Sequence, residues 1–411
     1  MASQNGDALE KRKEVIMKRS MFSLIAAMLC VMLLFAGCAS GGESSSQSSA
    51  DSTAVEPDSS EDSAEPESSG DSAVRTITDH AGNEVILPEK VERVAIGGLT
   101  PLTSVYCMFM GSSDGLVGIH PDSKNAAVNS ILGEAYPGLK ELPDGWASGD
   151  DINMEELLKL KPDVVFYNAD VTANYEALEA VGIPAVGFST TLYEDYNTID
   201  TFQAWIELLK DVMGDSDRAD GIIAYGEEVK SMVAEKLASL SDEEKPQALI
   251  LSNYNESAIT AGGISFANYW IASAGGNNLG YDIGAFVGQV NMEQVYEWNP
   301  EVLFLNSFSA YTPEDLYENT AVDGHDWSGI KAVQNKRVYK IPLGMYYWFP
   351  PSSDSPLMLQ WMAKQMHPDL FEDLDIEQEV REYYAQFYGI ELTDEQLDLI
   401  LNPTPESAAA F

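Results

Sequence analysis

The sequence predicts an α/β protein with two Rossmann-like lobes, each built on a mainly parallel sheet and joined to the other by a single long rigid helix. The first observation is an internal repeat, because residues 153–168 read NMEELLKLKPDVVFYN and residues 291–306 read NMEQVYEWNPEVLFLN. Each copy predicts a capped short helix, a Pro-acid break and a buried strand. The second observation is that strand-like and helix-like segments alternate on both sides of a long helical stretch. Two similar lobes leave a gap, so the fold class includes a ligand cleft between the lobes.

The N-terminal lobe is expected over residues 74–192. It opens with a hairpin at residues 76–87, in which Ala81-Gly82-Asn83 forms the turn. Short apolar runs that end at Gly, Pro or polar residues then predict buried strands, with helices between them. The predicted strands are 93–98, 116–120, 164–167 and 185–188; the predicted helices are one that starts near residue 101, the helix of the first repeat copy, and 175–181.

Residues 193–245 form a helical segment. Apolar residues at helical spacing predict one helix over residues 193–213, which Gly214 ends, and a longer helix over about residues 216–240. A helix of about 25 residues is nearly 40 Å long. That length is enough for the second helix to join the two lobes.

The C-terminal lobe is expected over residues 246–367, and residues 368–411 form an acidic helical extension that packs on the outside of this lobe. The lobe contains a strand at 248–252, a loop and helix within 262–274, the second repeat copy, a strand at 337–341 and a helix at 356–365. The same alternation of strands and helices as in the first lobe indicates the same kind of sheet.

The beginning of the chain has the pattern of a secretory signal. Lys18 and Arg19 precede an apolar stretch at residues 21–36, and Cys38 follows Ala-Gly, which resembles the lipobox of bacterial lipoproteins. We therefore expect residues 1–37 to be a lipoprotein signal peptide and Cys38 to be lipidated. A retained membrane anchor is the alternative, and either Met1 or Met17 starts the chain.

Residues 38–73 are expected to form a disordered acidic tether. They are mostly Ser, Gly, Ala, Asp and Glu, and they contain no Lys or Arg. Such a segment buries too little apolar surface to offset the entropy of ordering. The segment would hold the folded body near the membrane and leave it free to reorient.

Composition excludes several kinds of partner and bond. The formal net charge of −43 argues against nucleic-acid binding and against docking on anionic lipid head groups. After signal cleavage only Cys107 remains besides Cys38, so no intramolecular disulfide is expected. Cys107 lies in the apolar run VYCMFM, which favours a core residue over a nucleophile. We expect a monomer, because each lobe already supplies the other's partner.

Sequence motifs do not favour an enzyme or a bare-metal site. The chain has no HExxH motif, no Walker loop and no paired Cys/His arrangement. The turn Gly262-Gly263-Ile264-Ser265 has no basic residue beside it to hold a phosphate. The only histidines are His80, His120, His325 and His367, too few and too scattered for a closed zinc or manganese site. We expect no cofactor and no metal bound by the protein alone.

Five segments together resemble the substrate-binding lipoproteins of iron-complex and vitamin B12 ABC importers, a family that includes haem and siderophore binders. The segments are TITDHAGNEVILPEKVERVAIGG, NMEELLKLKPDVVFYN, ALEAVGIPAVGF, AGGNNLG and NKRVYKIP. The resemblance covers about residues 76–370. It implies two lobes on a rigid helix, a ligand held between them, and delivery to an ABC permease dimer with its ATPase. It also implies that Glu155 and Glu293, the acids that the two repeat copies share, contact arginines of the permease. The alternative for these acids is a favourable interaction with the helix dipole.

Candidate ligand-binding residues lie in loops at the carboxyl ends of the predicted strands, where open parallel sheets bind ligands. Many are aromatic, which suits flat or apolar ligands, although such residues also serve as packing. Few of these loops contain Lys or Arg, so we expect a neutral, weakly charged or cationic iron chelate, or a haem or cobalamin, rather than a polyanionic siderophore. The candidates are Trp146, Ser148, Tyr254, Tyr346, Tyr347, Trp348, His120 and Lys124.

The sequence thus predicts a membrane-anchored extracytoplasmic solute-binding protein of an ABC importer, located in the periplasm or at the cell surface. A surface lipoprotein hydrolase is one alternative, and a receptor that passes its ligand to a sensor is another.

Overall fold

The computed structural model describes residues 74–408. The predicted signal peptide, the lipidation site Cys38 and the predicted tether lie outside the described residues. The chain opens with a hairpin of β1 (Val74–Thr78) and β2 (Glu84–Pro88). The buried Asp79 carboxylate fixes this hairpin, because it accepts hydrogen bonds from the backbone N–H groups of Asn83 (2.8 Å) and Gly187 (2.9 Å).

The N-terminal lobe contains a four-stranded sheet in the order β4-β3-β7-β8, and every pairing in it is parallel. Helices connect the strands, because parallel neighbours need crossover connections. The strands are β3 (Val94–Ile96), β4 (Leu116–Ile119), β7 (Val164–Asn168) and β8 (Ala185–Phe188). The helical elements are α2 (Leu102–Met110), α3 (Pro121–Asn129), α4 (Leu132–Ala135), η1 (Pro137–Glu141), α5 (Met154–Leu160) and α6 (Thr172–Ala180), and a small ribbon pairs β5 (Ala147–Ser148) with β6 (Asp151–Ile152).

The C-terminal lobe contains a six-stranded mixed sheet with the main order β12-β10-β9-β13-β14. β13 pairs in parallel with β9 and β14, whereas β10 is antiparallel to β9 and β12. The strands are β9 (Gln247–Tyr254), β10 (Ile259–Gly262), β11 (Asn277–Asn278), which pairs with β9, β12 (Val287–Val290), β13 (Val302–Leu305) and β14 (Val338–Lys340). The helical elements are η2 (Asp242–Glu244), α9 (Phe266–Ser273), η3 (Tyr281–Ile283), α10 (Met292–Trp298), α11 (Pro313–Tyr317) and α12 (Lys331–Gln334).

The two repeat copies adopt the same local structure. In each copy an Asn side chain caps a seven-residue helix, Asn153 at α5 and Asn291 at α10. Each helix ends at a left-handed residue and leads into an inner strand, β7 or β13. The acid after the shared Pro also has the same role, because Asp163 and Glu301 each accept a hydrogen bond from a backbone N–H at the start of a neighbouring strand. The structure confirms the duplication that the sequence predicts.

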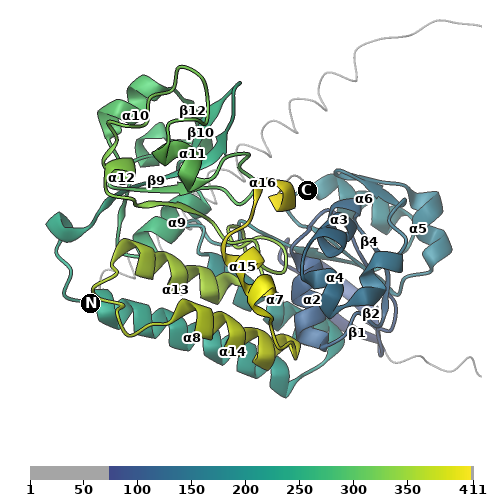
Figure 1. The fold of residues 1–411 in the computed structure, drawn as a ribbon. Coiled ribbons are helices and arrows are strands. Elements are labelled where there is room, and N and C mark those ends of the chain that lie inside the picture. Colours follow the sequence, from purple (N-terminus) through teal and green to yellow (C-terminus); the bar gives the residue numbers. More distant parts are fainter. Residues whose placement is uncertain (1–73, 409–411) are drawn as a thin grey trace, which may run out of the picture. The chain divides into compact units, whose positions relative to one another are not determined.

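Between the lobes the chain forms two packed helices, α7 (Thr198–Met213) and α8 (Asp217–Leu237). At the start of α8, Arg218 donates a hydrogen bond to the backbone carbonyl of Met108 in the N-terminal lobe. At its end, Leu237 lies against Gly275 of the C-terminal lobe. The α8 helix is also covered by α13 (Ser355–Met366). A connection by one isolated helix is therefore not confirmed, because α7, α8 and α13 form a helical layer (Figure 1).

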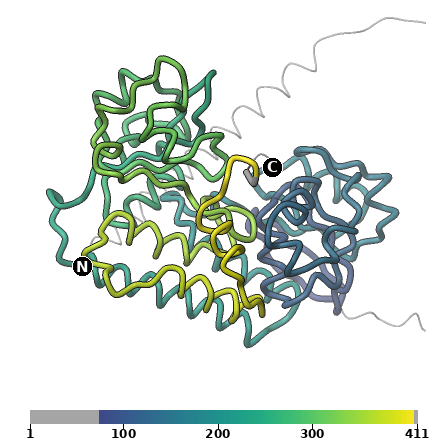
Figure 2. Tube along the Cα trace, in the orientation of Figure 1, coloured from purple at the N-terminus to yellow at the C-terminus, as the bar shows by residue number. Residues whose placement is uncertain are grey.

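The C-terminal extension consists of α14 (Ile376–Tyr388), α15 (Asp394–Leu401) and α16 (Pro405–Ala408). We expected it to pack outside the C-terminal lobe, and it also contacts the N-terminal lobe. The Gln396 side chain hydrogen-bonds Glu134 of α4, while the backbone N–H of Leu343 donates to the Ile400 carbonyl at 3.0 Å. Figure 2 shows the yellow end of the chain running between the green and blue parts.

A continuous apolar core links the lobes through this helical layer. It includes Ile96 and Phe166 of the first sheet, Trp205 of α7, and Phe304 and Trp361 of the C-terminal lobe. Cys107 is fully buried in the same core, and burial raises the pKa of its thiol. None of the helices within residues 74–408 has the length and apolar character that a membrane span requires.

Candidate functional site

Aromatic side chains form a row at one edge of the C-terminal lobe, and we call this row the aromatic wall. Several members follow the carboxyl ends of β13 and β14, where ligands of open α/β sheets bind, and others come from the starts of α9, β12 and α7. The members are Tyr196, Phe266, Phe286, Phe308, Tyr346, Tyr347 and Phe349.

The first part of the aromatic wall follows β13 and β14. Ring centroids are 4.6 Å apart for Phe308 and Tyr347, and 5.7 Å apart for Tyr346 and Tyr347. The ring centroids of Tyr347 and Phe349 are 6.0 Å apart, and those of Phe349 and Phe266 are 6.1 Å apart. These separations are those of edge-to-face and offset aromatic pairs. Phe266 and Phe349 are buried and support the half-buried rings of Phe308, Tyr346 and Tyr347.

The second part of the aromatic wall reaches the segment that enters α7. Phe266 lies 5.4 Å from Phe286, and Phe286 lies 5.4 Å from Tyr196 between ring centroids. Tyr196 has a φ of +57°. This left-handed conformation is uncommon for a residue with a bulky side chain, and here the aromatic contacts accompany it. Phe286 is 42% exposed, so the wall has an accessible ring at this end as well.

Two tyrosine hydroxyls of the aromatic wall are tied to neighbouring groups. The Thr100 side chain, at the carboxyl end of β3 in the N-terminal lobe, hydrogen-bonds Tyr346. Asn306 donates a hydrogen bond to the Tyr347 hydroxyl at 3.1 Å. Burial raises the pKa of Tyr346 to about 12, although the bond to Thr100 acts in the opposite direction. Both phenols therefore remain neutral at physiological pH, and they present rings and hydroxyls rather than charge.

A buried carboxylate beneath the aromatic wall holds the loop after β14. Asp354 accepts hydrogen bonds from the backbone N–H of Met345 (2.8 Å), from Trp348 Nε1 (3.0 Å) and from the hydroxyls of Tyr384 (3.0 Å) and Tyr388 (3.1 Å). Burial raises the pKa of Asp354, and these hydrogen bonds lower it. Both tyrosines belong to α14, so the C-terminal extension fixes the backbone that carries Tyr346 and Tyr347.

Gly344 is required at the beginning of this loop. Its φ is +64°, and a Cβ atom there would lie 2.2 Å from both Asp354 Oδ2 and Trp348 Nε1. Only glycine satisfies both conditions. Trp348, which we predicted to bind ligand, has its indole directed to Asp354 and is fully buried.

Two other predicted aromatic residues lie in the cores of their lobes. Tyr254 is buried, accepts a hydrogen bond from Trp327 Nε1 at 2.8 Å and packs against His325. Trp146 is 1% exposed and lies against the backbones of Gly97 and Gly118. Neither residue is part of the aromatic wall. Their roles in ligand binding stay predictions.

The predicted polar candidates lie in the N-terminal lobe. His120 caps α3, because its Nδ1 accepts from the Asp122 N–H at 3.1 Å while Nε2 lies 3.0 Å from the Gly149 carbonyl. Lys124 donates to the Leu142 carbonyl at 2.9 Å and lies 3.6 Å from Asp144. Both residues thus already have partners, and a ligand would have to replace them. Ser148 is exposed in β5.

The predicted permease contacts occupy equivalent places. Glu155 is exposed in the first turn of α5 and Glu293 is exposed in the first turn of α10. Neither acid forms an ion pair with another residue of the described part of the chain. Within residues 74–408 no group of three His, Cys, Asp or Glu side chains converges as a metal site would need.

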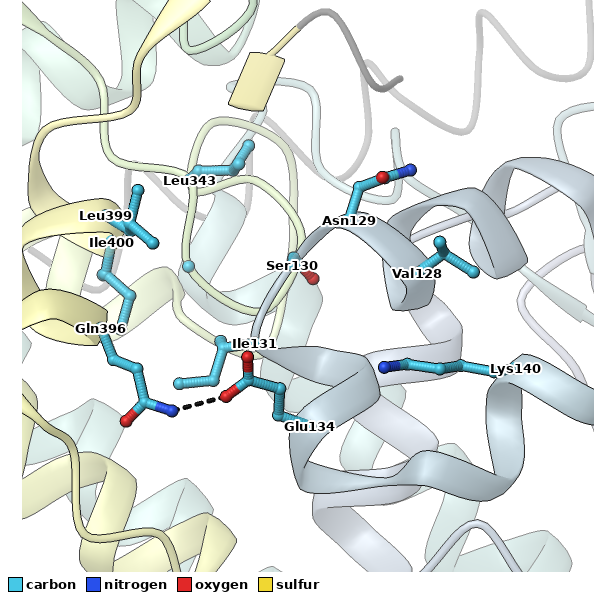
Figure 3. A pocket seen from close by; sticks show the side chains of 11 residues that line it. Val128, Asn129, Ser130, Ile131, Glu134, Lys140, Leu343, Gln396, Leu399 and Ile400 are labelled. Carbon is cyan, nitrogen blue, oxygen red and sulfur yellow. Dashed lines mark hydrogen bonds between the residues drawn. The ribbon is translucent and has the colours of Figure 1, made fainter. Parts of the chain in front are cut away.

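A pocket of about 220 Å³ lies beside the loop that begins at Gly344. Its walls come from α3 and α4 of the N-terminal lobe, from Leu343 and Gly344, and from α15. Figure 3 shows Gln396 of α15 reaching Glu134 of α4 across one side of this pocket. Close by, Ser130 donates a hydrogen bond to the Met345 carbonyl at 3.2 Å. Both lobes and the extension therefore meet next to Tyr346.

One short motif has the letters of a hydrolase nucleophile elbow. Residues 111–115 read GSSDG, which fits the pattern G-x-S-x-G. A nucleophile elbow leads from a strand into a helix, whereas this segment leads from the end of α2 into β4. The segment is therefore a helix-to-strand turn, in which Gly111 provides the left-handed C-cap.

Sequence reasoning missed four members of the aromatic wall, Tyr196, Phe266, Phe286 and Phe308. Phe308 follows the strand of the second repeat copy, so its position alone was a usable signal. The other three come from the segment before α7, the start of α9 and the residue before β12, and the tertiary fold brings them together.

Comparison with known proteins places this geometry in a family. The model of the family described as periplasmic binding protein matches residues 136–343. A periplasmic solute-binding protein of known structure from Veillonella parvula is 32% identical, with a TM-score of 0.73, and the match covers 82% of this chain and 100% of that one. The molybdate-binding protein MolA of Haemophilus influenzae is 26% identical over 338 residues, which are 77% of this chain and 91% of MolA.

A third relative, YvrC of Bacillus subtilis, is named as an uncharacterised ABC transporter substrate-binding lipoprotein. It is 21% identical over 354 residues, which are 85% of this chain and 98% of YvrC. Solved structures that share the fold at lower identity include haem-binding and Fe³⁺-hydroxamate transport proteins. Because the family model spans half of the sequence and a relative of 32% identity is matched from end to end, the chain belongs to the periplasmic binding protein family and is an extracytoplasmic solute-binding protein of an ABC transporter, not an enzyme.

Proposed function

We propose that the protein captures a planar or apolar metal complex, of the iron-chelate, haem or corrinoid class, and delivers it to an ABC permease. The aromatic wall is the observation that carries this proposal. Its seven rings follow one another at centroid distances between 4.6 and 6.1 Å. Rings in such a row provide a broad apolar surface for a flat ligand.

Charge supports a ligand that is not a polyanion. Lys124, the basic residue that we predicted for the N-terminal side, already binds the Leu142 carbonyl and lies near Asp144. Lys340, at the end of β14, is buried and donates to the Ser309 carbonyl at 2.8 Å. A catecholate complex of high negative charge needs several free cations to balance it, and the aromatic wall supplies none.

MolA is named for molybdate, which makes a small oxyanion the second candidate ligand. An oxyanion is held by several converging hydrogen-bond donors, such as backbone N–H groups or cationic side chains. At the aromatic wall the hydroxyls of Tyr346 and Tyr347 already have partners in Thr100 and Asn306. The aromatic character of the wall therefore favours the metal complex over molybdate.

Delivery requires contact with the permease and retention at the membrane. The exposed carboxylates of Glu155 and Glu293, one in each lobe, provide two equivalent points for charge-assisted hydrogen bonds with permease arginines. Lipidation of Cys38 would keep the protein at the membrane. The naming of YvrC as a lipoprotein supports this anchor. A ligand receptor that feeds a sensor would instead leave solute uptake unchanged when both carboxylates are removed.

Titration of the purified protein tests the ligand. We expect tight binding of haem, cobalamin or a ferric hydroxamate, and weak binding of molybdate and of a ferric catecholate. Absorbance spectroscopy and calorimetry measure the binding. The variant Y346A/Y347A should lose about tenfold or more in affinity, because each ring contributes about 1–3 kcal/mol when it is a central contact.

Tyr281→Ala is the matched control for this titration, since Tyr281 is an exposed tyrosine of the same lobe outside the aromatic wall. It should bind like the wild type. Tight binding of molybdate alone, with no effect of Y346A/Y347A, would overturn the proposed ligand class.

A further inference from the structure

The two repeat helices each expose one apolar residue at the same position. Leu158 of α5 is 47% exposed and Tyr296 of α10 is 42% exposed. They occupy the same place in the two sequence copies, five residues after the capping Asn. Most apolar residues of the two helices are otherwise turned inward, as Leu157 and Val295 are. Single exposed apolar residues are ordinary, but a matched pair at duplicated positions requires its own explanation.

In both helices the exposed apolar residue shares a face with an acid. Residues three apart on a helix lie on the same side, so Leu158 lies beside Glu155 and Tyr296 beside Glu293. On α5 the nearby Lys159 is paired with Glu156 at 2.6 Å, which leaves Glu155 for another partner. The Tyr296 hydroxyl accepts a hydrogen bond from the Asp326 N–H at 3.1 Å. That bond holds the phenol and leaves part of the ring exposed.

Building on the proposed delivery function, we propose that Leu158 and Tyr296 are a matched pair of apolar anchors that pack against the two subunits of the permease. The matched acid and apolar residue on each lobe suit a partner that presents the same surface twice, as a two-fold symmetric dimer does. Each subunit would offer a basic residue for the acid and an apolar pocket for the anchor. Figure 1 shows α5 and α10 at edges of their lobes that face away from α8 and α14.

A second copy of this chain is the other partner with two-fold symmetry, and charge disfavours it. Each anchor is flanked by exposed carboxylates, Glu155 and Glu156 in one lobe and Glu293 and Glu297 in the other. Two copies would bring like charges together, in a chain whose formal net charge is −43. Like-charge contacts of this kind suppress association, whereas a basic permease surface is attracted.

Site-specific photocrosslinking in the native host tests the contact. Benzoylphenylalanine replaces Leu158 or Tyr296 in the full chain, and Leu370, an exposed apolar residue of the segment after α13, serves as the control position. We expect both anchor positions to crosslink to the permease, which mass spectrometry identifies. Because the two subunits of the dimer present the same surface, both positions should give crosslinks to the same polypeptide. The control position should give no such product. Crosslinks to a second copy of the chain, or to no membrane subunit, would overturn the proposal.

The affinity of purified variants for the permease–ATPase complex in nanodiscs measures how much each anchor contributes to docking. We expect Leu158→Ser and Tyr296→Ser each to weaken association about fivefold, and the double variant about 25-fold, as for separate interface contacts. Leu370→Ser should stay within about twofold of the wild type. Tyr296→Phe keeps the ring and loses only the bond to Asp326, so it should also bind normally. Thermal unfolding confirms that each variant is folded.

A variant that lacks both acids distinguishes failure of this inference from failure of the proposed function. If Glu155→Ala/Glu293→Ala abolishes association while L158S/Y296S does not, the apolar anchors are wrong and delivery to the permease stands. If the wild type itself does not associate with the complex or stimulate its ATP hydrolysis, the proposed delivery function fails. If both double variants lose association and still bind solute as the wild type does, both proposals hold.

Discussion

Lys340 and Asp354 are charged residues buried in the C-terminal lobe, and they differ in their hydrogen bonding. Asp354 accepts four hydrogen bonds, whereas the Lys340 ammonium donates to the Ser309 carbonyl. Burial lowers the pKa of Lys340 to about 8, and the carboxylates of Asp315 and Glu406 offset only part of this effect. The folded protein therefore favours the neutral amine of Lys340 more than the unfolded chain does.

This difference predicts how Lys340→Met changes stability with pH. The unfolded chain keeps the Lys340 proton up to the ordinary pKa of 10.5, while the folded protein releases it near pH 8. Between these values the unfolded state binds more protons, so stability of the wild type rises with pH. Below pH 8 the buried charge costs about 3 kcal/mol for a shift of this size. Lys340→Met should thus gain roughly 1–2 kcal/mol over the wild type at pH 7, after loss of the bond to Ser309.

Urea unfolding at pH 7 and at pH 10 measures the effect. The advantage of Lys340→Met over the wild type should be largest at pH 7 and should vanish or reverse at pH 10. An equal difference at both pH values for Lys340→Met would contradict the argument.

Among the elements, the sequence was most informative where structure depends on local pattern. The duplicated helices α5 and α10, with their Asn caps and the strands that follow, form as the repeat predicts. The end of α7 and the start of α8 lie at the predicted residues, because Gly214 and the Ser216 cap are local signals, whereas α7 begins at Thr198 and not at residue 193. The antiparallel strands β10 and β12 were not predicted. Their pairing with each other is set by residues about 30 positions apart, which no local period reports.

The aromatic wall was also predictable only where it depends on local sequence. Tyr346 and Tyr347 were predicted from their place after a strand, and they do meet other rings. Trp348 comes next in the same loop, yet its indole turns to the buried Asp354. Composition indicates that a loop is aromatic, but it does not indicate which rings face outward. That choice depends on partners such as Tyr384, which the sequence places in a distant helix.

The Asn caps of the repeat give a prediction at the scale of the element. Asn153 accepts from the Glu155 and Glu156 N–H groups, and Asn291 accepts from the Gln294 N–H at 2.9 Å. Asn153→Ala and Asn291→Ala should each lower the free energy of unfolding by about 1 kcal/mol. The caps lie in different lobes and share no partner, so the losses should add in the double variant. Asn→Ser at either position keeps an acceptor and should cost much less in the same urea titration.

At the scale of the whole molecule, the lobes share one apolar core and several polar contacts. Ser353 donates a hydrogen bond to Ser104 at 2.9 Å across the junction, and both hydroxyls are buried. The core runs without a break from Phe166 through Trp205 to Trp361. Separating the lobes at this junction would expose part of that apolar surface, at about 25 cal/mol for each Å². We therefore expect the lobes to keep this contact whether or not a ligand is bound.

A reversible crosslink at the junction checks this expectation. Ser104→Cys/Ser353→Cys is prepared with Cys30, Cys38 and Cys107 replaced by Ser or Ala, so that only the new pair can form a disulfide. Because the junction is expected to stay closed, the oxidised and reduced forms should bind haem, or the solute found by titration, with affinities within about twofold of each other. Ser353→Cys alone controls for the substitution itself. A loss of binding on oxidation that reduction restores would mean instead that ligand entry requires the lobes to part at their base, and that the shared core opens during the transport cycle.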